Sequence, residues 1–311
     1  MTKKNNSQND KSVEFLCRTC FGRLLLHFIL FIRIPKLAGF FLRSPLSHFM
    51  IGKFIRKNKV DMKEFEGQKF LSFNDFFTRR KQISFDSEKN HLISPCDSFL
   101  SVVKITENAV FSVKGFDYSL RDFFEPRENC TPRRFFWNKG TNPAEMPSES
   151  YINSLSEKFR NGECLIFRLC TTDYHRYCYI DSGIKSENHF IEGSLYSVQP
   201  AACEKFRVYT KNRRSWTIME CENFGTVAQI EVGAFSVGGI KNHKSKGRFN
   251  KGEEKGYFDL YGSTIVLLFE PQKISLIPEI QEQTKNGAEC KVRAGQWIGV
   301  GLRDISRKFL L

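Results

Sequence analysis

The sequence KGYFDLYGSTIVLLFEP, residues 255–271, contains the strongest strand signal of the chain. Its run TIVLLF, residues 264–269, is apolar without alternation, and such a run predicts a β-strand that is buried on both faces. A strand of this kind is held by its neighbours, so the residue that precedes it is placed rigidly as well. We therefore expect Ser263, which directly follows Gly262, to have a fixed position.

Further strands are predicted on both sides of this one. Five stretches are rich in Val, Ile or Phe and are bounded by Gly or charged turns: residues 99–105, 163–170, 193–198, 215–222 and 226–235. In the last of them, apolar residues alternate with Gln229 and Glu231, which predicts a strand with one face in solvent. These stretches indicate an α+β fold, with a β-rich catalytic body and helices before it.

Two serine–aspartate pairs predict the starts of short helices. Ser72 with Asp75, and Ser119 with Asp122, have the spacing of a capping box. The polar residues 125–158 predict a long mobile insertion.

Composition bounds the class of protein. The chain has 311 residues, a formal net charge of +14 and 41% hydrophobic residues, which excludes a disordered tail or a low-complexity fibre. Much of the basic charge lies beside Phe, Leu and Ile in the first 60 residues, a pattern that favours a membrane surface over nucleic acid as the partner. Ten cysteines are too sparse for a disulfide scaffold, so we expect reduced thiols in the cytosol. The polar first residues carry no apolar stretch and predict no signal peptide.

The N-terminal region predicts contact with a membrane without crossing it. The most apolar stretch, residues 24–32, is shorter than the roughly 20 residues that a bilayer crossing requires. After it, Ser44 and Pro45 predict a helix start, and an apolar stripe follows at helical spacing: Leu46, Phe49, Met50, Phe54 and Ile55. That stripe could pack on the protein's own core. Residues 18–60 contain no acidic side chain, however, which favours helices lying in an anionic headgroup layer. We expect a membrane-associating region at 1–65 and a catalytic body at 66–311.

Few residues carry a chemical signal. The chain contains no HExxH, GxSxG, P-loop or GxGxxG motif, and the pair Cys17 and Cys20 lacks a second pair at zinc spacing, so we expect no metal site. Three places remain: Asp97, His175 and Gly262–Ser263. A serine after glycine could attack the preceding carbonyl, with a histidine held by an aspartate as base. Each place could also be structural, as a turn or a buried histidine.

Eight blocks of sequence, in order, resemble the phosphatidylserine decarboxylases, which are pyruvoyl-dependent membrane enzymes. The blocks are FNDFFTRR (73–80), SPCDS (94–98), YSLRDFF (118–124), RLCTTDYHRYCYIDSG (168–183), GSLYSVQP (193–200), FGTVAQIEVGAFSVGGI (224–240), KGEEKGYFDLYGSTIVLLFEP (251–271) and VRAGQWIGVG (292–301). The seventh is the most specific, because this family cuts itself at GST or GSS before an apolar strand.

The resemblance implies a self-cleaving carboxy-lyase. Ser263 would attack the carbonyl of Gly262, and elimination would split the chain into a β chain, 1–262, and an α chain, 263–311, which stay together as a heterodimer. Ser263 would become a covalent pyruvoyl group, so no pyridoxal phosphate and no metal are expected. Asp97 and His175 would deprotonate Ser263, with His175 as a base near its working pH and as a candidate proton donor after decarboxylation. Through a Schiff base, phosphatidylserine would become phosphatidylethanolamine and CO2. A further dimer is compatible with the family.

The chain departs from the family pattern at two places. Many members have a second histidine where this chain has Cys178, and the block around Asp97 has Cys96 and Ser98 where Ala and Gly are common. If the second histidine is the base in those relatives, this chain must use His175 or work differently.

A basic stretch at residues 241–251 precedes the cleavage block. We expect it to be either a loop that contacts the lipid phosphate or a solvated basic loop; the candidate headgroup contacts are Lys241, Lys244, Lys246 and Arg248. Two other functions remain open at this point: a cleavage-dead homologue that binds anionic lipid, or a pyruvoyl decarboxylase of a related serine lipid. The expected location is peripheral, on the cytoplasmic face of the membrane, with no nucleic-acid partner.

Overall fold

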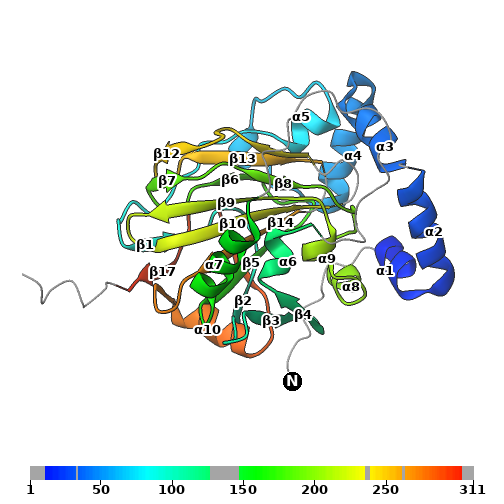
Figure 1. Cartoon of the computed structure of the whole chain (residues 1–311). Helices are drawn as coiled ribbons and strands as arrows, with labels where there is room; N and C mark the ends of the chain where they lie inside the picture. Colours follow the sequence, from blue (N-terminus) through cyan, green and yellow to red (C-terminus); the bar gives the residue numbers. More distant parts are fainter. Residues whose placement is uncertain (1–10, 33, 127–146, 235–238, 261–262, 303–311) are drawn as a thin grey trace, which may run out of the picture.

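A computed structural model describes residues 11–32, 34–126, 147–234, 239–260 and 263–302. Helices at the N-terminal side lie along one side of a β-rich body (Figure 1), so the expected α+β fold is confirmed. These helices are α1 (Lys11–Arg18), α2 (Cys20–Phe31), α3 (Ile34–Arg43), the 3₁₀ turn η1 (Pro45–His48) and α4 (Phe49–Asn58). A second 3₁₀ turn, η2 (Lys63–Phe65), and α5 (Phe73–Phe77) lead into the body.

The body is built on one large antiparallel sheet. Its strands run in the order β12 (Gly247–Phe249), β7 (Gly183–Lys185), β9 (Arg214–Cys221), β10 (Gly225–Gly233), β14 (Ser263–Phe269), β5 (Glu163–Leu169), β2 (Ser98–Lys104) and β16 (Cys290–Val292), with β8 (His189–Ile191) also on β9. Smaller sheets are β1 (His91–Ile93), β17 (Trp297–Gly301) and β15 (Ile274–Leu276); β11 (Gly239–Asn242), β13 (Glu254–Asp259) and β6 (Arg176–Cys178); and β3 (Val110–Val113) with β4 (Phe116–Ser119). The remaining helices are α6 (Arg121–Phe124), α7 (Glu149–Phe159), α8 (Pro200–Cys203), α9 (Val208–Lys211) and α10 (Pro278–Lys285).

Strand β14 is buried on both faces, as its apolar run predicts. Val266 and Leu268 belong to one hydrophobic cluster, and Ile265, Leu267 and Phe269 belong to another. Successive side chains of a strand point to opposite faces, so the two clusters lie on opposite sides of the large sheet. The strand therefore ties the two halves of the core together.

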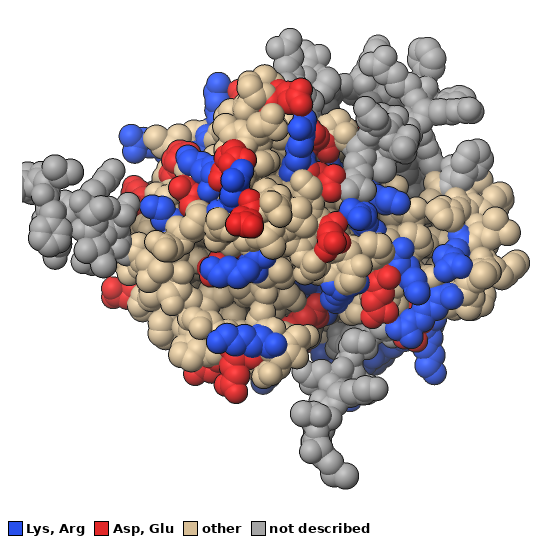
Figure 2. Space-filling model, turned by 60° about the horizontal axis from the view of Figure 1, so that its bottom comes forward, with Lys and Arg blue, Asp and Glu red and all other residues tan. Residues whose placement is uncertain are grey.

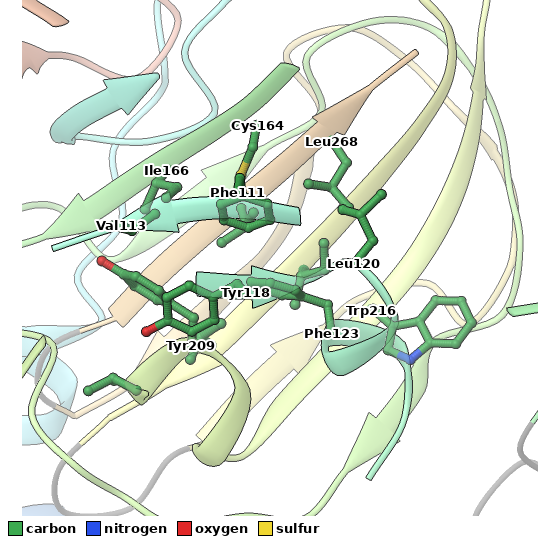
Figure 3. Packing of buried hydrophobic residues seen from close by; sticks show 14 of the residues in the cluster. Phe111, Val113, Tyr118, Leu120, Phe123, Cys164, Ile166, Tyr209, Trp216 and Leu268 are labelled. Atoms are coloured by element: carbon green, nitrogen blue, oxygen red, sulfur yellow. The ribbon is translucent and has the colours of Figure 1, made fainter. Parts of the chain in front are cut away.

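The first cluster is completed by the β3–β4 hairpin and by α6 to α9. Figure 3 shows Leu268 of β14 and Ile166 of β5 with Phe111, Tyr118 and Phe123, which come from the hairpin and from α6. Phe111 and Phe123 stack with ring centroids 5.5 Å apart. Helix α7 contributes to the same cluster, so residues 149–158 are part of the packed body and not of a mobile insertion; residues 127–146 lie outside the described residues.

The prediction of a half-buried strand at β10 is wrong. Gln229 and Glu231 are fully buried, because β13 covers the face of the sheet on which they stand. Lys255 of β13 places its Nζ 2.5 Å from Glu231 Oε1 and 2.8 Å from Asn242 Oδ1. A buried carboxylate needs such a partner, and alternation of polar residues along a strand cannot tell a paired buried charge from a solvated one.

Two further local predictions have different outcomes. Residues 193–198 form no strand; Ser194 makes only an isolated bridge with Asn212. The first capping box is confirmed, because Ser72 Oγ accepts from Asp75 N at 3.2 Å and the Asp75 carboxylate accepts from Leu71 N at 2.9 Å. At the second, helix α6 begins without a side-chain cap.

The apolar stripe after Ser44 divides between core and surface. The helix begins as the turn η1 and continues as α4. Leu46 and Phe49 are each 74% exposed, whereas Met50, Phe54 and Ile55 pack on a third cluster: Leu42, Ile51, Phe73, Phe76, Phe77 and Leu260. Core packing therefore accounts for Met50, Phe54 and Ile55, and contact of Leu46 and Phe49 with a membrane stays a prediction. In the described part of the chain, no helix has the length and apolar character needed to cross a bilayer.

The buried pair of Lys255 and Glu231 makes a prediction about stability. Lys255→Met leaves a buried carboxylate unpaired and is expected to lower the free energy of unfolding by about 3–5 kcal/mol. The double change Lys255→Met with Glu231→Leu removes both charges and is expected to cost less. Urea denaturation measures both, with Lys104→Met as control, because Lys104 is 71% exposed in its ion pair with Glu163. A loss for Lys255→Met no larger than for the control would contradict this account.

Candidate active site

Ser263 lies at the first position of β14, in the middle of the large sheet. It stands opposite Gly233 of β10 and Leu169 of β5, and it is 1% exposed. Its Oγ has no hydrogen-bond partner among the described residues, and Gly262 lies outside them. A buried hydroxyl usually has a partner, so an unpartnered one at a fixed position marks a place where chemistry can occur.

The segment before Ser263 passes from one sheet to another. Strand β13 belongs to the small sheet with β6 and β11, whereas β14 belongs to the large sheet. Leu260 has a left-handed backbone conformation with φ of 51° and is fully buried in the third cluster. Arg43 of α3 places its Nη2 2.5 Å from Asp259 Oδ2, and Phe258 N donates to His175 O at 2.9 Å. Arg43 and His175 therefore hold the end of β13 in place.

His175 is fully buried just before β6. Its Nδ1 lies 2.8 Å from the Asp173 carbonyl oxygen, and its ring lies 4.0 Å from the Phe77 ring. Because a carbonyl only accepts, Nδ1 carries the proton, and Nε2 presents a lone pair that no described residue uses. Burial lowers the pKa of His175 to about 3, with a smaller lowering from the charges of Arg79 and Lys291. The expectation of a base near its working pH is therefore wrong for this structure: the imidazole is firmly neutral.

Asp97 lies in the loop between β1 and β2. Its Oδ1 accepts a hydrogen bond from Ala294 N at 2.8 Å, and no hydrogen bond between Asp97 and His175 is present among the described residues. The proposed pair is thus not joined directly in this structure.

Cys178 packs against the loop that carries Asp97. Its backbone N donates to Pro95 O at 2.9 Å, and its Sγ lies 3.5 Å from the same oxygen. Burial, with a smaller contribution from the nearby Asp97 carboxylate, raises the pKa of Cys178 to about 12. The position at which the resemblance implies a histidine in many members therefore packs on the loop that carries Asp97, and it is occupied here by a neutral thiol.

The basic stretch at 241–251 is partly tied down. Lys244 pairs with Glu253 at 2.5 Å, and Lys246 pairs with Glu187 at 3.2 Å. Lys185 donates to the backbone oxygens of Lys244 and Ser245. The other two candidate contacts, Lys241 and Arg248, have no ion pair within the described residues, and Lys251 Nζ donates to the backbone oxygens of Glu88 and His91.

Arg79 was not among the residues singled out in the sequence. It is 5% exposed and is close enough to Asp97, Asp173 and Tyr174 for their charges to raise its pKa, although burial lowers that pKa more. The sequence feature that could have pointed to Arg79 is the pair of arginines that ends FNDFFTRR, directly after a short aromatic helix. In the described residues, no group of three or more His, Cys, Asp or Glu side chains could hold a metal ion.

Comparison with known proteins identifies the family of this chain. A family model described as phosphatidylserine decarboxylase matches residues 73–300. Phosphatidylserine decarboxylase proenzyme 2 of Clostridium acetobutylicum is 39% identical over 291 residues, which cover 92% of this chain and 91% of that protein. Phosphatidylserine decarboxylase proenzymes of Clostridium beijerinckii and Clostridium tetani are 37% and 38% identical, over 85% and 84% of this chain and 83% and 82% of those proteins. The resemblance drawn from the eight blocks is thus confirmed, and the chain belongs to the phosphatidylserine decarboxylase family.

Proposed function

We propose that this protein cleaves itself at Gly262/Ser263 and then decarboxylates phosphatidylserine to phosphatidylethanolamine at a membrane surface. The observation that carries the proposal is Ser263: a buried hydroxyl without a described partner, at the first position of a strand held on both sides. Ser263 begins a rigid strand, and the strand before it belongs to another sheet. We infer that this arrangement suits an attack by Ser263 Oγ on the peptide bond that precedes it.

The proposed cleavage proceeds in three steps. Ser263 Oγ attacks the carbonyl carbon of Gly262 and loses its proton to a base; the C–N bond between the two residues then breaks, the released amine takes up a proton, and the peptide has become an ester. Elimination removes the Cα proton of Ser263, breaks the Cβ–Oγ bond and releases the carboxylate of residue 262. Water then displaces the α-nitrogen as ammonia and leaves a pyruvoyl group at position 263. This group supplies an electron sink for the loss of CO2 from the lipid amine, so neither pyridoxal phosphate nor a metal is required.

His175 is the proposed base. Its neutral Nε2 is available to accept a proton at any pH well above 3, and the Nδ1 contact with Asp173 O fixes the tautomer. Asp97 is proposed to stabilise the positive charge that His175 gains, through space because no direct hydrogen bond joins them in the described residues. After cleavage, His175 is also the proposed donor of the proton that replaces CO2.

The two fragments are proposed to remain one heterodimer. Three strands of residues 263–311 pair with strands of residues 1–262: β14 with β5 and β10, β16 with β2, and β17 with β1. Breaking one peptide bond removes none of these pairings. The buried apolar strand β14 would also be costly to expose.

Residues 1–65 are proposed to hold the enzyme peripherally at the cytoplasmic face of an anionic membrane. Apolar side chains of α2 and α3 are exposed without cover from the described chain: Phe21 67%, Leu24 69%, Phe28 57%, Leu37 71% and Phe40 80%. Figure 2 shows uncharged surface at the right edge, where these helices lie, with Lys and Arg beside it. Apolar side chains flanked by cations suit the headgroup layer of an anionic leaflet.

The proposed function predicts activity on a defined lipid. The purified protein should release CO2 from phosphatidylserine dispersed in neutral detergent, and Ser263→Ala should release none, because the pyruvoyl group cannot form. Ser154→Ala, an exposed serine of α7, should behave as the wild type. A folded wild-type chain that stays uncut and inactive would instead support a homologue that only binds lipid.

A second prediction separates His175 from Cys178 as the base. Cys178→Ala should cleave within about 3-fold of the wild-type rate, because a thiol with a pKa of about 12 stays protonated. His175→Gln should cleave at least about 100-fold more slowly. Because the pKa of His175 lies at about 3, its neutral form persists as the pH falls from about 8 to about 5, and its titration should not slow cleavage there. Time courses on denaturing gels measure these rates, and an uncut Cys178→Ala would contradict the assignment.

A further inference from the structure

A pocket of about 440 Å³ lies beside the candidate active site. Four cations line it, Lys69, Arg79, Arg80 and Arg176, with Asp75 as the one acidic residue of its lining. Figure 1 places α5, which carries part of this lining, next to the N-terminal helices. An excess of positive charge around a cavity favours an anion as its occupant.

Arg79 is buried in this pocket without a direct salt bridge, and the nearest negative charges are the carboxylates of Asp97 and Asp173. Its Nη1 and Nη2 donate long hydrogen bonds to Phe76 O at 3.3 Å and Thr172 O at 3.4 Å, and its Nε has no partner among the described residues. The guanidinium lies 4.7 Å from the Phe65 ring centroid and pairs with no carboxylate of the described chain. A buried cation of this kind is costly unless an anion joins it.

The other charges of the pocket are partly engaged. Arg176 pairs with Glu254 at 2.7 Å and holds the Thr78 carbonyl at 2.8 Å, so it shapes the wall of the pocket. The Asp75 carboxylate accepts from the Leu71 backbone. Lys69 has no ion pair within the described residues, and Arg80 is 3.9 Å from Glu254. The pocket keeps positive charge after these pairings.

The lining of the pocket adjoins the surroundings of His175: Arg176 directly follows it in the chain, and Arg79 is two residues after Phe77, whose ring lies 4.0 Å from the His175 ring. On the inner side, the charge of Arg79 reaches His175 and lowers its pKa. On the outer side, Leu71 is 77% exposed and Phe49 is 74% exposed, and His48 Nδ1 contacts Phe70 O at 2.8 Å. Cations next to exposed apolar side chains match the level of the phosphates at a membrane surface.

We propose that this pocket binds the phosphodiester of the lipid whose headgroup enters the candidate active site. The proposal rests on the proposed function and assigns its substrate subsite to Lys69, Arg79 and Arg80. The serine carboxylate is the less suitable occupant, because a cation on that group would stabilise the ground state and oppose the loss of CO2. The planar guanidinium group of arginine can donate two parallel hydrogen bonds to phosphate oxygens, and these oxygens keep their charge throughout the reaction.

The experiment compares kinetic constants for a short-chain phosphatidylserine in neutral-detergent micelles. The variants are Lys69→Gln with Arg80→Gln, both exposed and of low risk to folding, and Arg79→Lys, which keeps the charge without the fork. Lys104→Gln is the matched control, because Lys104 is an exposed cation on β2, far along the sheet. Self-cleavage is checked first on a gel, so that each sample contains only matured enzyme.

The double variant is expected to raise KM about 10-fold with kcat within about 3-fold of the wild type, and Arg79→Lys is expected to raise KM by a smaller factor. Inorganic phosphate should compete with the lipid in the wild type and about 10-fold less well in the double variant. An unchanged KM in an active double variant would overturn the pocket assignment while the proposed function stands. Phosphate binding that the double variant loses, together with an unchanged KM, would assign the pocket to free phosphate and overturn the lipid assignment.

A wild type without activity would still allow a test of the pocket. Sedimentation with vesicles of phosphatidylglycerol in phosphatidylcholine then measures binding directly. A loss of binding of about 5-fold or more in the double variant, relative to Lys104→Gln, would support a lipid phosphodiester site. Equal binding by the double variant and the control would overturn it.

Discussion

The position of β14 between β5 and β10 is the constraint on which the rest of the structure depends. Seven residues of this strand pair on both sides, from Ser263 to Phe269, and its side chains enter both hydrophobic clusters. Sliding the strand by one residue would exchange the two sets of apolar side chains, so the register is strongly specified. Ser263 is therefore placed by the core itself, and the same pairings would keep two fragments together after a break before it.

Local sequence patterns predicted the strands well where burial follows from the residues themselves. The run at 264–269 is apolar throughout, and its burial needs no knowledge of its neighbours. Burial of Gln229 and Glu231 depends instead on Lys255, which arrives from β13 in another sheet. Alternation within one strand carries no information about such a partner. The apolar stripe of α4 divides for a similar reason, because only the side that meets α5 and Leu260 is covered.

The sequence predicts individual candidate residues of the site, but it does not predict how they are arranged. Sequence blocks named Asp97, His175 and Ser263, whereas the contacts join Asp97 to Ala294 and His175 to the carbonyl of Asp173. The depressed pKa of His175 follows from complete burial, which a motif does not report. Arg79 shows the same limit, since its lack of a direct salt bridge becomes visible only when Phe76, Thr172 and the pocket are seen together.

The central claim is that a rigidly placed Ser263 breaks the bond before it and changes chemically. Intact-mass spectrometry of the purified wild type and of Ser263→Ala tests this directly. The account predicts two wild-type fragments, 1–262 and 263–311, with the smaller one lighter by the difference between an N-terminal serine and a pyruvoyl group, and a single uncut variant chain. A folded wild-type chain of one unbroken mass, or a smaller fragment that begins with unmodified serine, would contradict it.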